Sequence, residues 1–226
     1  MGVYVSDEIC FHDEKKTTHR RLAGLVDEQV ENAIRAIDEE NVELANMVLE
    51  KEDKVDKFDV KIEKICLKIF ALNQPVAMDL RLIMSALTIN TNLERIGDIA
   101  VNIAQNFLLI KKKPQFIDKT RYNEMSALVK EMLRNAIDSF IQNDAKLAKK
   151  VIETDDVLDE HNKVNHQVLK EIMKESCDNI EPAVAFLVIG RQMERLGDHA
   201  TNIAEDVYFI VEAQMVKHKY EKYFFA

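Results

Sequence analysis

A short segment with the pattern Glu-Arg-x-Gly-Asp occurs twice in this chain, first within residues 92–104 and again within residues 192–204. A second set of matches, at an offset of 103 residues, relates the stretch from Asn32 to Asp56 to the stretch from Asn135 to Asp159. Self-similarity over this much of a chain indicates a duplicated structural unit. The chain is therefore expected to fold as two copies of one structural unit, each formed by about half of the sequence.

The composition predicts that this unit is helical. Only 5 glycines and 3 prolines occur among 226 residues, and 47% of the residues are hydrophobic. A chain that is poor in turn formers and rich in Ala, Leu, Ile, Glu and Lys favours α-helices, and this length buries a sizeable core. We expect the all-α class.

Apolar stripes at helical spacing place three long helices in the first half. The first runs from about His12 to Glu40, and the second begins near Asn41 and ends near Asn73 because Pro75 disfavours helical geometry in the residue before it. The second carries an apolar stripe from Leu44 to Leu72, and the third carries one from Leu82 to Phe107. Because three long helices with short connections pack as an antiparallel bundle, the duplication predicts two tandem three-helix bundles, residues 1–116 and residues 117–226.

Charge and cysteine content exclude several classes. The formal net charge of −9 argues against nucleic-acid binding, which requires a cationic face. Three widely spaced cysteines form neither a disulfide framework nor a zinc-ligand pattern. No segment is long and apolar enough to span a bilayer, and a signal-peptide pattern is absent, so we expect a cytoplasmic protein. The basic and aromatic tail at residues 217–225 is either a partner or membrane contact or, more ordinarily, a frayed helix end.

Oxygen-bearing side chains follow one face of each second and third helix at steps of three and four residues. On the third helices the rows are Glu94, Asp98 and Asn102, and Glu194, Asp198 and Asn202. On the second helices they are Glu52, Asp56, Asp59 and Glu63, and at the offset of 103 Asp155, Asp159, Asn162 and His166. Each half therefore carries two acidic pairs of the form acid-x-x-x-Asp, one on each of two helices expected to be neighbours.

A pair of facing acidic rows is unfavourable unless its charges are neutralised by protonation or by a bound cation. Carboxylate and amide oxygens suit hard ions such as Mg²⁺, Mn²⁺, Ca²⁺ or iron, and each cluster has room for more than one. The competing interpretation is that these residues line solvated helix faces. Gly97 and Gly197 favour the metal site because glycine inside a helix needs a reason, although close helix packing is also such a reason.

The sequence at these positions resembles the PhoU family, bacterial regulatory proteins of phosphate transport. The resemblance is carried by Gln-Pro-Val-Ala-Met-Asp-Leu-Arg at residues 74–81 and by the two Glu-Arg-x-Gly-Asp segments, and it covers nearly the whole chain. The second half lacks a copy of the first motif and has Ile180-Glu181-Pro182-Ala183 there, which leaves open whether the two metal sites are equivalent.

The resemblance implies tandem three-helix bundles with multinuclear metal sites at the four acidic pairs. It also implies a cytoplasmic, usually dimeric, negative regulator of the phosphate-starvation response and of phosphate uptake. The implied partners are the ATPase subunit of the ABC phosphate transporter and a membrane-bound sensor histidine kinase, so that membrane association occurs only through partners.

Two other readings of the residues stay open. A metalloenzyme would use carboxylate-bound iron or manganese for redox or hydrolytic chemistry, although the Glu-x-x-His motif of di-iron bundles is absent because Gly197 stands three residues after Glu194. A helical scaffold would leave the acidic rows solvated. We expect a non-enzymatic adaptor.

Overall fold

Long helices follow the apolar stripes of the sequence in the computed structural model, which describes residues 4–73, 75–76 and 78–214. Within these residues the chain forms six α-helices and two short 3-10 helices: α1 (Tyr4–Asp38), α2 (Val42–Asn73), α3 (Met78–Ile110), η1 (Gln115–Lys119), α4 (Tyr122–Gln142), α5 (Ala145–Glu175), η2 (Cys177–Asn179) and α6 (Ile180–Glu212). The all-α prediction is confirmed.

Local signals fix where these helices begin and end. The side chain of Asn41 accepts a hydrogen bond from the backbone N–H of Leu44, at 3.1 Å, and the side chain of Asp144 accepts from the N–H groups of Lys146 and Leu147, at 2.9 and 3.1 Å. Both side chains satisfy backbone donors that the first turn of a helix leaves unpaired. At the other ends, Lys111 and Asn143 take positive φ angles of 56° and 54°, which stop α3 and α4.

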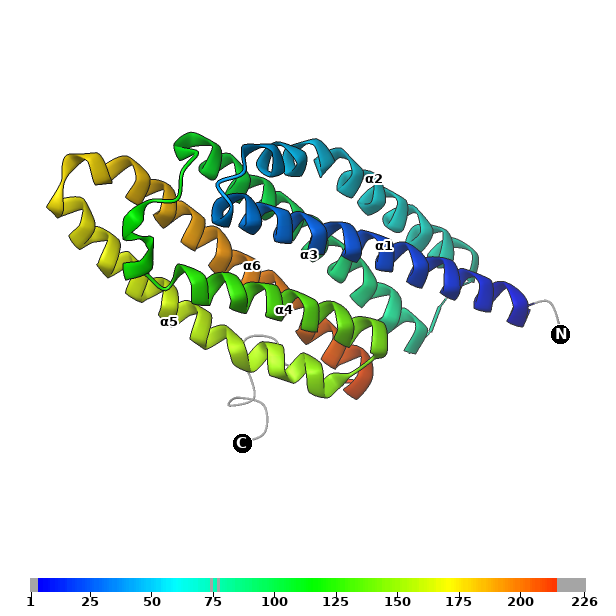
Figure 1. Ribbon diagram of the computed structural model, residues 1–226. Helices are drawn as coiled ribbons and strands as arrows, with labels where there is room; N and C mark the ends of the chain where they lie inside the picture. The colour runs from blue at the N-terminus through cyan, green and yellow to red at the C-terminus, as the bar shows by residue number, and fades with distance from the viewer. Residues whose placement is uncertain (1–3, 74, 77, 215–226) are drawn as a thin grey trace, which may run out of the picture.

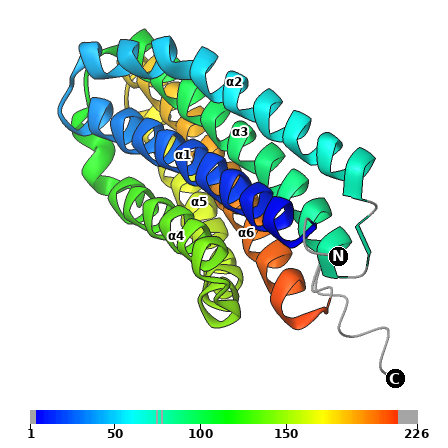
Figure 2. The same ribbon diagram turned by 90° about the vertical axis from the view of Figure 1, so that its right-hand side faces the viewer.

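The two repeats lie side by side as two three-helix bundles (Figure 1). Helices α1, α2 and α3 contact one another, α4, α5 and α6 do the same, and α3 packs along α6 across the middle of the molecule. Figure 2 shows α1 and α4 on the same side of the molecule, where the two helices contact each other. Buried residues from all six helices form one hydrophobic cluster. The predicted division between residues 116 and 117 falls within η1, and the core extends across both repeats.

The predicted apolar stripes are buried or partly buried, with one clear exception. Leu22, Val26, Ala33 and Ile37 of α1 are fully buried, as are Met125, Val129 and Ala136 at the corresponding places in α4. Leu72, the last position predicted for the stripe of α2, is 66% exposed. It lies in the final turn of α2, next to the connection to α3, so the prediction for this residue was wrong.

No helix among residues 4–73 and 78–214 is long and apolar enough to cross a membrane. The tail at residues 217–225, and Gln74 and Ala77 of the Gln-Pro-Val-Ala motif, lie outside the described residues.

Candidate functional site

The glycines of the repeated segment bring the acidic helices close together. A Cβ atom on Gly97 of α3 would lie 3.2 Å from Cγ1 of Val55 on α2, and a Cβ atom on Gly197 of α6 would overlap Cδ2 of Leu158 on α5. A larger side chain at either position would push the helix pair apart. Close packing therefore explains both glycines, and it also sets the distance between the two rows of polar residues.

In the second repeat the row on α5 faces the row on α6. Burial raises the pKa of Asp155 to about 6, with smaller contributions from the charges of Asp198 and Asp159. Burial also raises the pKa of Asp198, together with the charges of Glu194 and Asp159. Carboxylates on two helices thus raise one another's pKa, which requires that they share one poorly solvated space. The hydroxyl of Thr201 donates a hydrogen bond to Asp155, at 3.3 Å, and partly offsets this effect.

The first repeat shows the same arrangement between α2 and α3. Burial is the largest cause of a raised pKa at Glu52, followed by the charges of Asp98 and Asp56. Burial also raises the pKa of Glu94, with Asp98 adding to the rise and Arg95 opposing it. The pKa of Asp59 is raised by burial and then by Glu63 and Asp56. The acidic side chains of α2 and α3 therefore also act on one another across the helix pair.

Different neighbours hold the two rows, so the two clusters are not equivalent. In the first repeat, the side-chain N–H group of Asn90 donates to Oδ1 of Asp59, at 2.6 Å, and Arg95 lies 3.5 Å from Glu94 and 3.4 Å from Asp98. One hundred residues later, Gly190 stands in place of Asn90. There Asn162 turns to Glu194 instead and donates to its carboxylate, which also pairs with Arg191.

The two asparagines that end the α3 and α6 rows make other contacts. Asn102 donates to the backbone carbonyl of Asp98, at 2.9 Å, and Asn202 donates to the side-chain oxygen of Asn92 on α3, at 3.3 Å. The same oxygen accepts from Nδ1 of His199, at 2.9 Å. A step of four residues is slightly longer than one helical turn of 3.6 residues, so each step rotates the side chain by about 40° around the helix. Asn202 stands two such steps after Glu194 and is rotated about 80° from it. Asn202 therefore faces the contact between the repeats rather than α5.

His166 lies at the edge of the second cluster. It lines a pocket of about 360 Å³ together with Asp159, Asn162 and Glu194, and with four other polar residues: Lys163, Gln167, Lys170 and Arg191. Both Nε2 of His166 and Oδ1 of Asn162 are buried without a hydrogen-bond partner. Buried polar atoms normally find partners, so two such atoms beside two carboxylates identify a place suited to a cation or to water.

The donor set fits a hard cation in type, because carboxylate and amide oxygens dominate and a single imidazole joins them. The side-chain positions are less closely arranged than a metal site requires: among the residues that the structure describes, no three His, Cys, Asp or Glu side chains converge on one point. Repulsion between the negative charges favours rotamers that keep the carboxylates of the two rows apart. Metal binding here therefore requires these carboxylates to turn toward each other.

Sequence reasoning missed Asn90, Thr201 and Arg191. Asn90 precedes Glu94 by four residues, so extending the α3 row one step backwards would have found it. Thr201 and Arg191 have Val101 and Thr91 as their counterparts, so neither follows from the repeat. Their contacts with the acidic rows depend on side-chain directions that only the packed helices determine.

Comparison with known proteins gives the same family for both halves. A sequence model of the PhoU domain matches residues 19–107 and again residues 122–207. A phosphate-specific transport system accessory protein PhoU homolog of Aquifex aeolicus is 41% identical over 93% of this chain and 95% of its own length. The crystal structure of PhoU from Pseudomonas aeruginosa superposes with a TM-score of 0.87 at 31% identity, covering 91% of this chain and 99% of that one.

A structure of the phosphate transport system regulatory protein PhoU from Streptococcus pneumoniae gives a TM-score of 0.78 at 26% identity and the same coverage. The duplicated sequence, the paired three-helix bundles and these matches all point to the same family in both halves. The chain therefore belongs to the PhoU family.

Proposed function

We propose that this protein is a negative regulator of phosphate uptake and of the phosphate-starvation response. The observation that carries the proposal is a match over 93% of the chain to a relative named as an accessory protein of a phosphate-specific transport system. In this proposal the protein is a cytoplasmic homodimer. It acts as an adaptor between the ATPase subunit of the ABC phosphate transporter and a sensor histidine kinase.

A clean deletion of the gene in its own host tests the regulatory role. We expect genes of the phosphate-starvation response to be expressed in high phosphate, where the intact strain keeps them silent. Restoring the gene should silence them again. Unchanged expression after deletion would reject the proposal. Co-purification from the same host tests the partners, since both the transporter ATPase subunit and the kinase should be retained by the tagged protein.

The proposal includes metal binding by the two acidic clusters, with iron, Mn²⁺ or Mg²⁺ as the ion. In the first repeat, Glu52, Asp56, Glu94 and Asp98 would hold it, and in the second repeat Asp155, Asp159, Glu194 and Asp198 would do so, with Asp59, Asn162 and His166 at the edges. A bound cation would neutralise the repulsion that raises the pKa of Asp155 and Asp198. It would thereby pull α2 toward α3 and α5 toward α6.

Elemental analysis of the purified protein tests this part directly. Changing Asp56, Asp98, Asp159 and Asp198 together to Asn should abolish retained metal. The matched control changes four exposed acids outside the rows, Glu50, Glu153, Glu160 and Glu171, to Gln, and should retain it. Equal metal content in all three proteins would show that the acidic rows are simply solvated, as in the scaffold reading.

A metalloenzyme is the second candidate, and the pocket at His166 favours it because unpaired ligand atoms there lie beside two carboxylates. Hydrolytic or redox turnover by the metal-loaded protein, lost in Asp159→Asn without loss of folding, would support this reading. A protein that retains metal and shows no turnover would instead support the adaptor.

A further inference from the structure

A stripe of lysines on the exposed face of α2 marks the first repeat. Lys54, Lys57, Lys61, Lys64 and Lys68 follow one another at steps of three, four, three and four residues, and all five are exposed. This spacing places them on one face of the helix. We refer to these five residues as the lysine stripe.

The second repeat lacks this stripe. At the offset of 103 residues, the five corresponding positions of α5 are Val157, Glu160, Val164, Gln167 and Glu171. The duplicated unit therefore does not need lysines here in order to fold. A general solubility role is also a poor explanation, because a chain with a net charge of −9 gains little repulsion from added cations.

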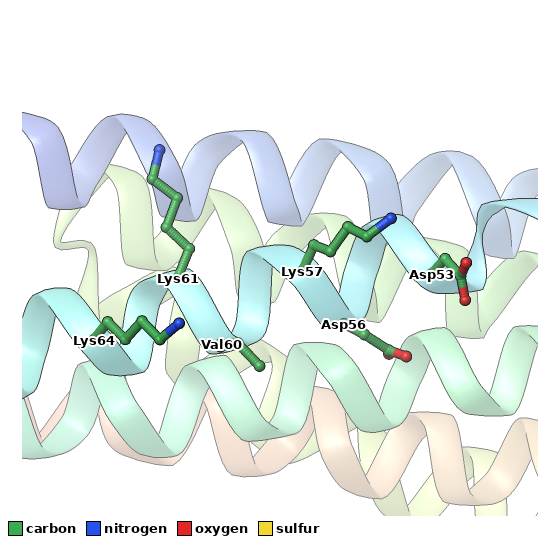
Figure 3. Close-up of a pocket in the computed structure, with 6 residues that line it drawn as sticks. All are labelled: Asp53, Asp56, Lys57, Val60, Lys61 and Lys64. Carbon is green, nitrogen blue, oxygen red and sulfur yellow. The ribbon is translucent and has the colours of Figure 1, made fainter.

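Four of the five lysines serve neither internal ion pairs nor a discrete anion pocket. Lys54, Lys57, Lys61 and Lys64 form no ion pair with any residue that the structure describes. Three of them line an open depression of about 540 Å³, whose described walls are Asp53, Asp56, Lys57, Val60, Lys61 and Lys64. Figure 3 shows that the three ammonium groups spread along α2 and point in different directions rather than toward a common centre. The positive charge is distributed over a surface.

Exposed apolar side chains continue this surface at the end of the helix pair. Leu67 and Leu72 on α2, Val76 in the connection, and Met78 at the start of α3 are between 63% and 71% exposed. Monomeric proteins seldom expose several large apolar side chains together without a binding role. In Figure 1 the end of α2 and the start of α3 lie at one end of the molecule, near the start of α1.

We propose that the lysine stripe and the apolar end of the α2–α3 pair dock directly on a membrane surface that contains anionic lipids. Lysines next to exposed apolar side chains match a bilayer interface, where the ammonium groups meet lipid phosphates and the apolar groups enter the acyl boundary. Lysine is depleted from protein–protein interfaces, which makes a protein partner the poorer fit. The ammonium groups do not converge on one point (Figure 3), which disfavours free phosphate.

Vesicle flotation with the purified full-length protein tests the proposal, without transporter or kinase. The protein should bind phosphatidylcholine vesicles that contain phosphatidylglycerol, should not bind phosphatidylcholine alone, and should be released by salt. Absence of binding to the anionic vesicles, or equal binding to neutral ones, would overturn the proposal. Because neither partner protein is present, this outcome is independent of the regulatory role.

A triple variant with Lys57→Gln, Lys61→Gln and Lys64→Gln should bind the anionic vesicles about 100-fold more weakly. This corresponds to about 3 kcal/mol at ~1.4 kcal/mol per tenfold change, with ~1 kcal/mol for each lysine near an anionic surface. The matched control removes the same charge from exposed lysines of α5 through Lys146→Gln, Lys149→Gln and Lys174→Gln, and should bind normally. Equal loss in both variants would overturn the assignment to α2.

A second pair of variants addresses the apolar end. Leu72→Ser with Val76→Ser should weaken vesicle binding about tenfold because two apolar groups no longer enter the interface. Leu109→Ser, which removes an equally exposed leucine from the far end of α3, should have no effect. Unchanged binding by the Leu72 and Val76 variant would overturn the two-part surface.

Two further binding measurements distinguish a lipid-binding surface from a site for other anions. Poly-glutamate that binds as tightly as the vesicles, with the same dependence on the three lysines, would overturn the lipid assignment in favour of an acidic protein segment. Inorganic phosphate that binds in equilibrium dialysis and is lost in the triple lysine variant would overturn it in favour of a phosphate site. We expect neither.

Discussion

Two helical glycines with different surroundings show what a single residue contributes here. Gly197 is held against Leu158, where a Cβ atom has no room, whereas Gly24 in α1 has nothing within 4 Å of the place where a Cβ atom would stand. Both lie within helices, where glycine is about 1 kcal/mol less favourable than alanine. The backbone cost is the same at the two sites, and the packing differs.

Alanine at these two positions should therefore change stability in opposite directions. We expect Gly24→Ala to raise the free energy of unfolding by about 0.5–1 kcal/mol, and Gly197→Ala to lower it by about 1–3 kcal/mol through overpacking against Leu158. Urea unfolding of both variants measures this. Stabilisation by Gly197→Ala would show that α5 and α6 separate without cost, and the close approach would then not matter.

The protonation of Asp155 links the second cluster to pH. Its pKa of about 6 lies above the ordinary value of 3.8, so the folded state binds this proton more tightly than the unfolded chain. The resulting stabilisation is fully present below about pH 4 and is lost as the pH rises through 6. The raised pKa values of Asp198, Glu52, Asp59 and Glu94 act in the same direction.

In a chelating buffer, the free energy of unfolding should thus decline between about pH 4 and pH 6. Asp155→Asn should flatten the decline and should raise stability above pH 6 by about 1 kcal/mol, a figure reduced for the partial solvation of this side chain. Glu153→Gln, on the exposed face of the same helix, should follow the parent protein. A parent whose stability rises across this window would contradict the assignment.

The sequence predicted the ends of α2 well, whereas it placed the start of the first helix near His12 and α1 begins at Tyr4. Asn41 and Pro75 bracket the second helix in the sequence, and α2 begins and ends within a residue or two of these signals. The signals are local, because a cap or a proline acts on its own turn. Apolar periodicity predicted the buried faces for a related reason, since it records which face is withdrawn from water.

The directions of individual polar side chains could not be predicted in the same way. The rows were inferred from spacing, yet Asn202 reaches Asn92 on another helix and Asn162 pairs with Glu194. Helical spacing fixes a side chain's angle around its own helix, but the choice among neighbouring partners depends on how far the helices have rotated and slid. Leu72 illustrates the same limit, because periodicity continues past the point where partner helices end.

Removing the N-terminal cap of α5 tests how much this local signal contributes to the stability of the helix. Asp144→Ala should lower the free energy of unfolding by about 1 kcal/mol, because two backbone N–H groups in the first turn lose their acceptor. Asp144→Asn should recover most of this loss, since an asparagine side chain also caps helices. Thermal unfolding of the three proteins provides the comparison, and an alanine variant as stable as the parent would show that the turn is capped by water instead.

At the scale of the whole molecule, the duplication does not produce two independent units. The hydrophobic cluster contains buried residues from both repeats, and α3 packs along α6. The duplication was readable in the sequence because similar segments recur at offsets of 103 and 100 residues. The shared core was not, since residues that pack between bundles follow the same helical period as residues that pack within one.

The chain should accordingly unfold in one cooperative transition despite its length. Calorimetric and van't Hoff enthalpies should agree, and Ile103→Ala, which removes a fully buried side chain from α3, should lower the midpoint of that single transition. The expected cost is about 2–5 kcal/mol. Two resolved transitions, with only one shifted by the substitution, would show that the bundles fold separately.

The antiparallel course of α3 and α6 also gives the protein the properties of a spacer. The α2–α3 and α5–α6 connections emerge at opposite extremities (Figure 1), and each central helix has 33 residues, or about 50 Å at 1.5 Å per residue. Binding partners at the two extremities would be kept about 50 Å apart by a rigid rod. Inserting two helical turns into both central helices and their neighbours would lengthen that separation without altering either end.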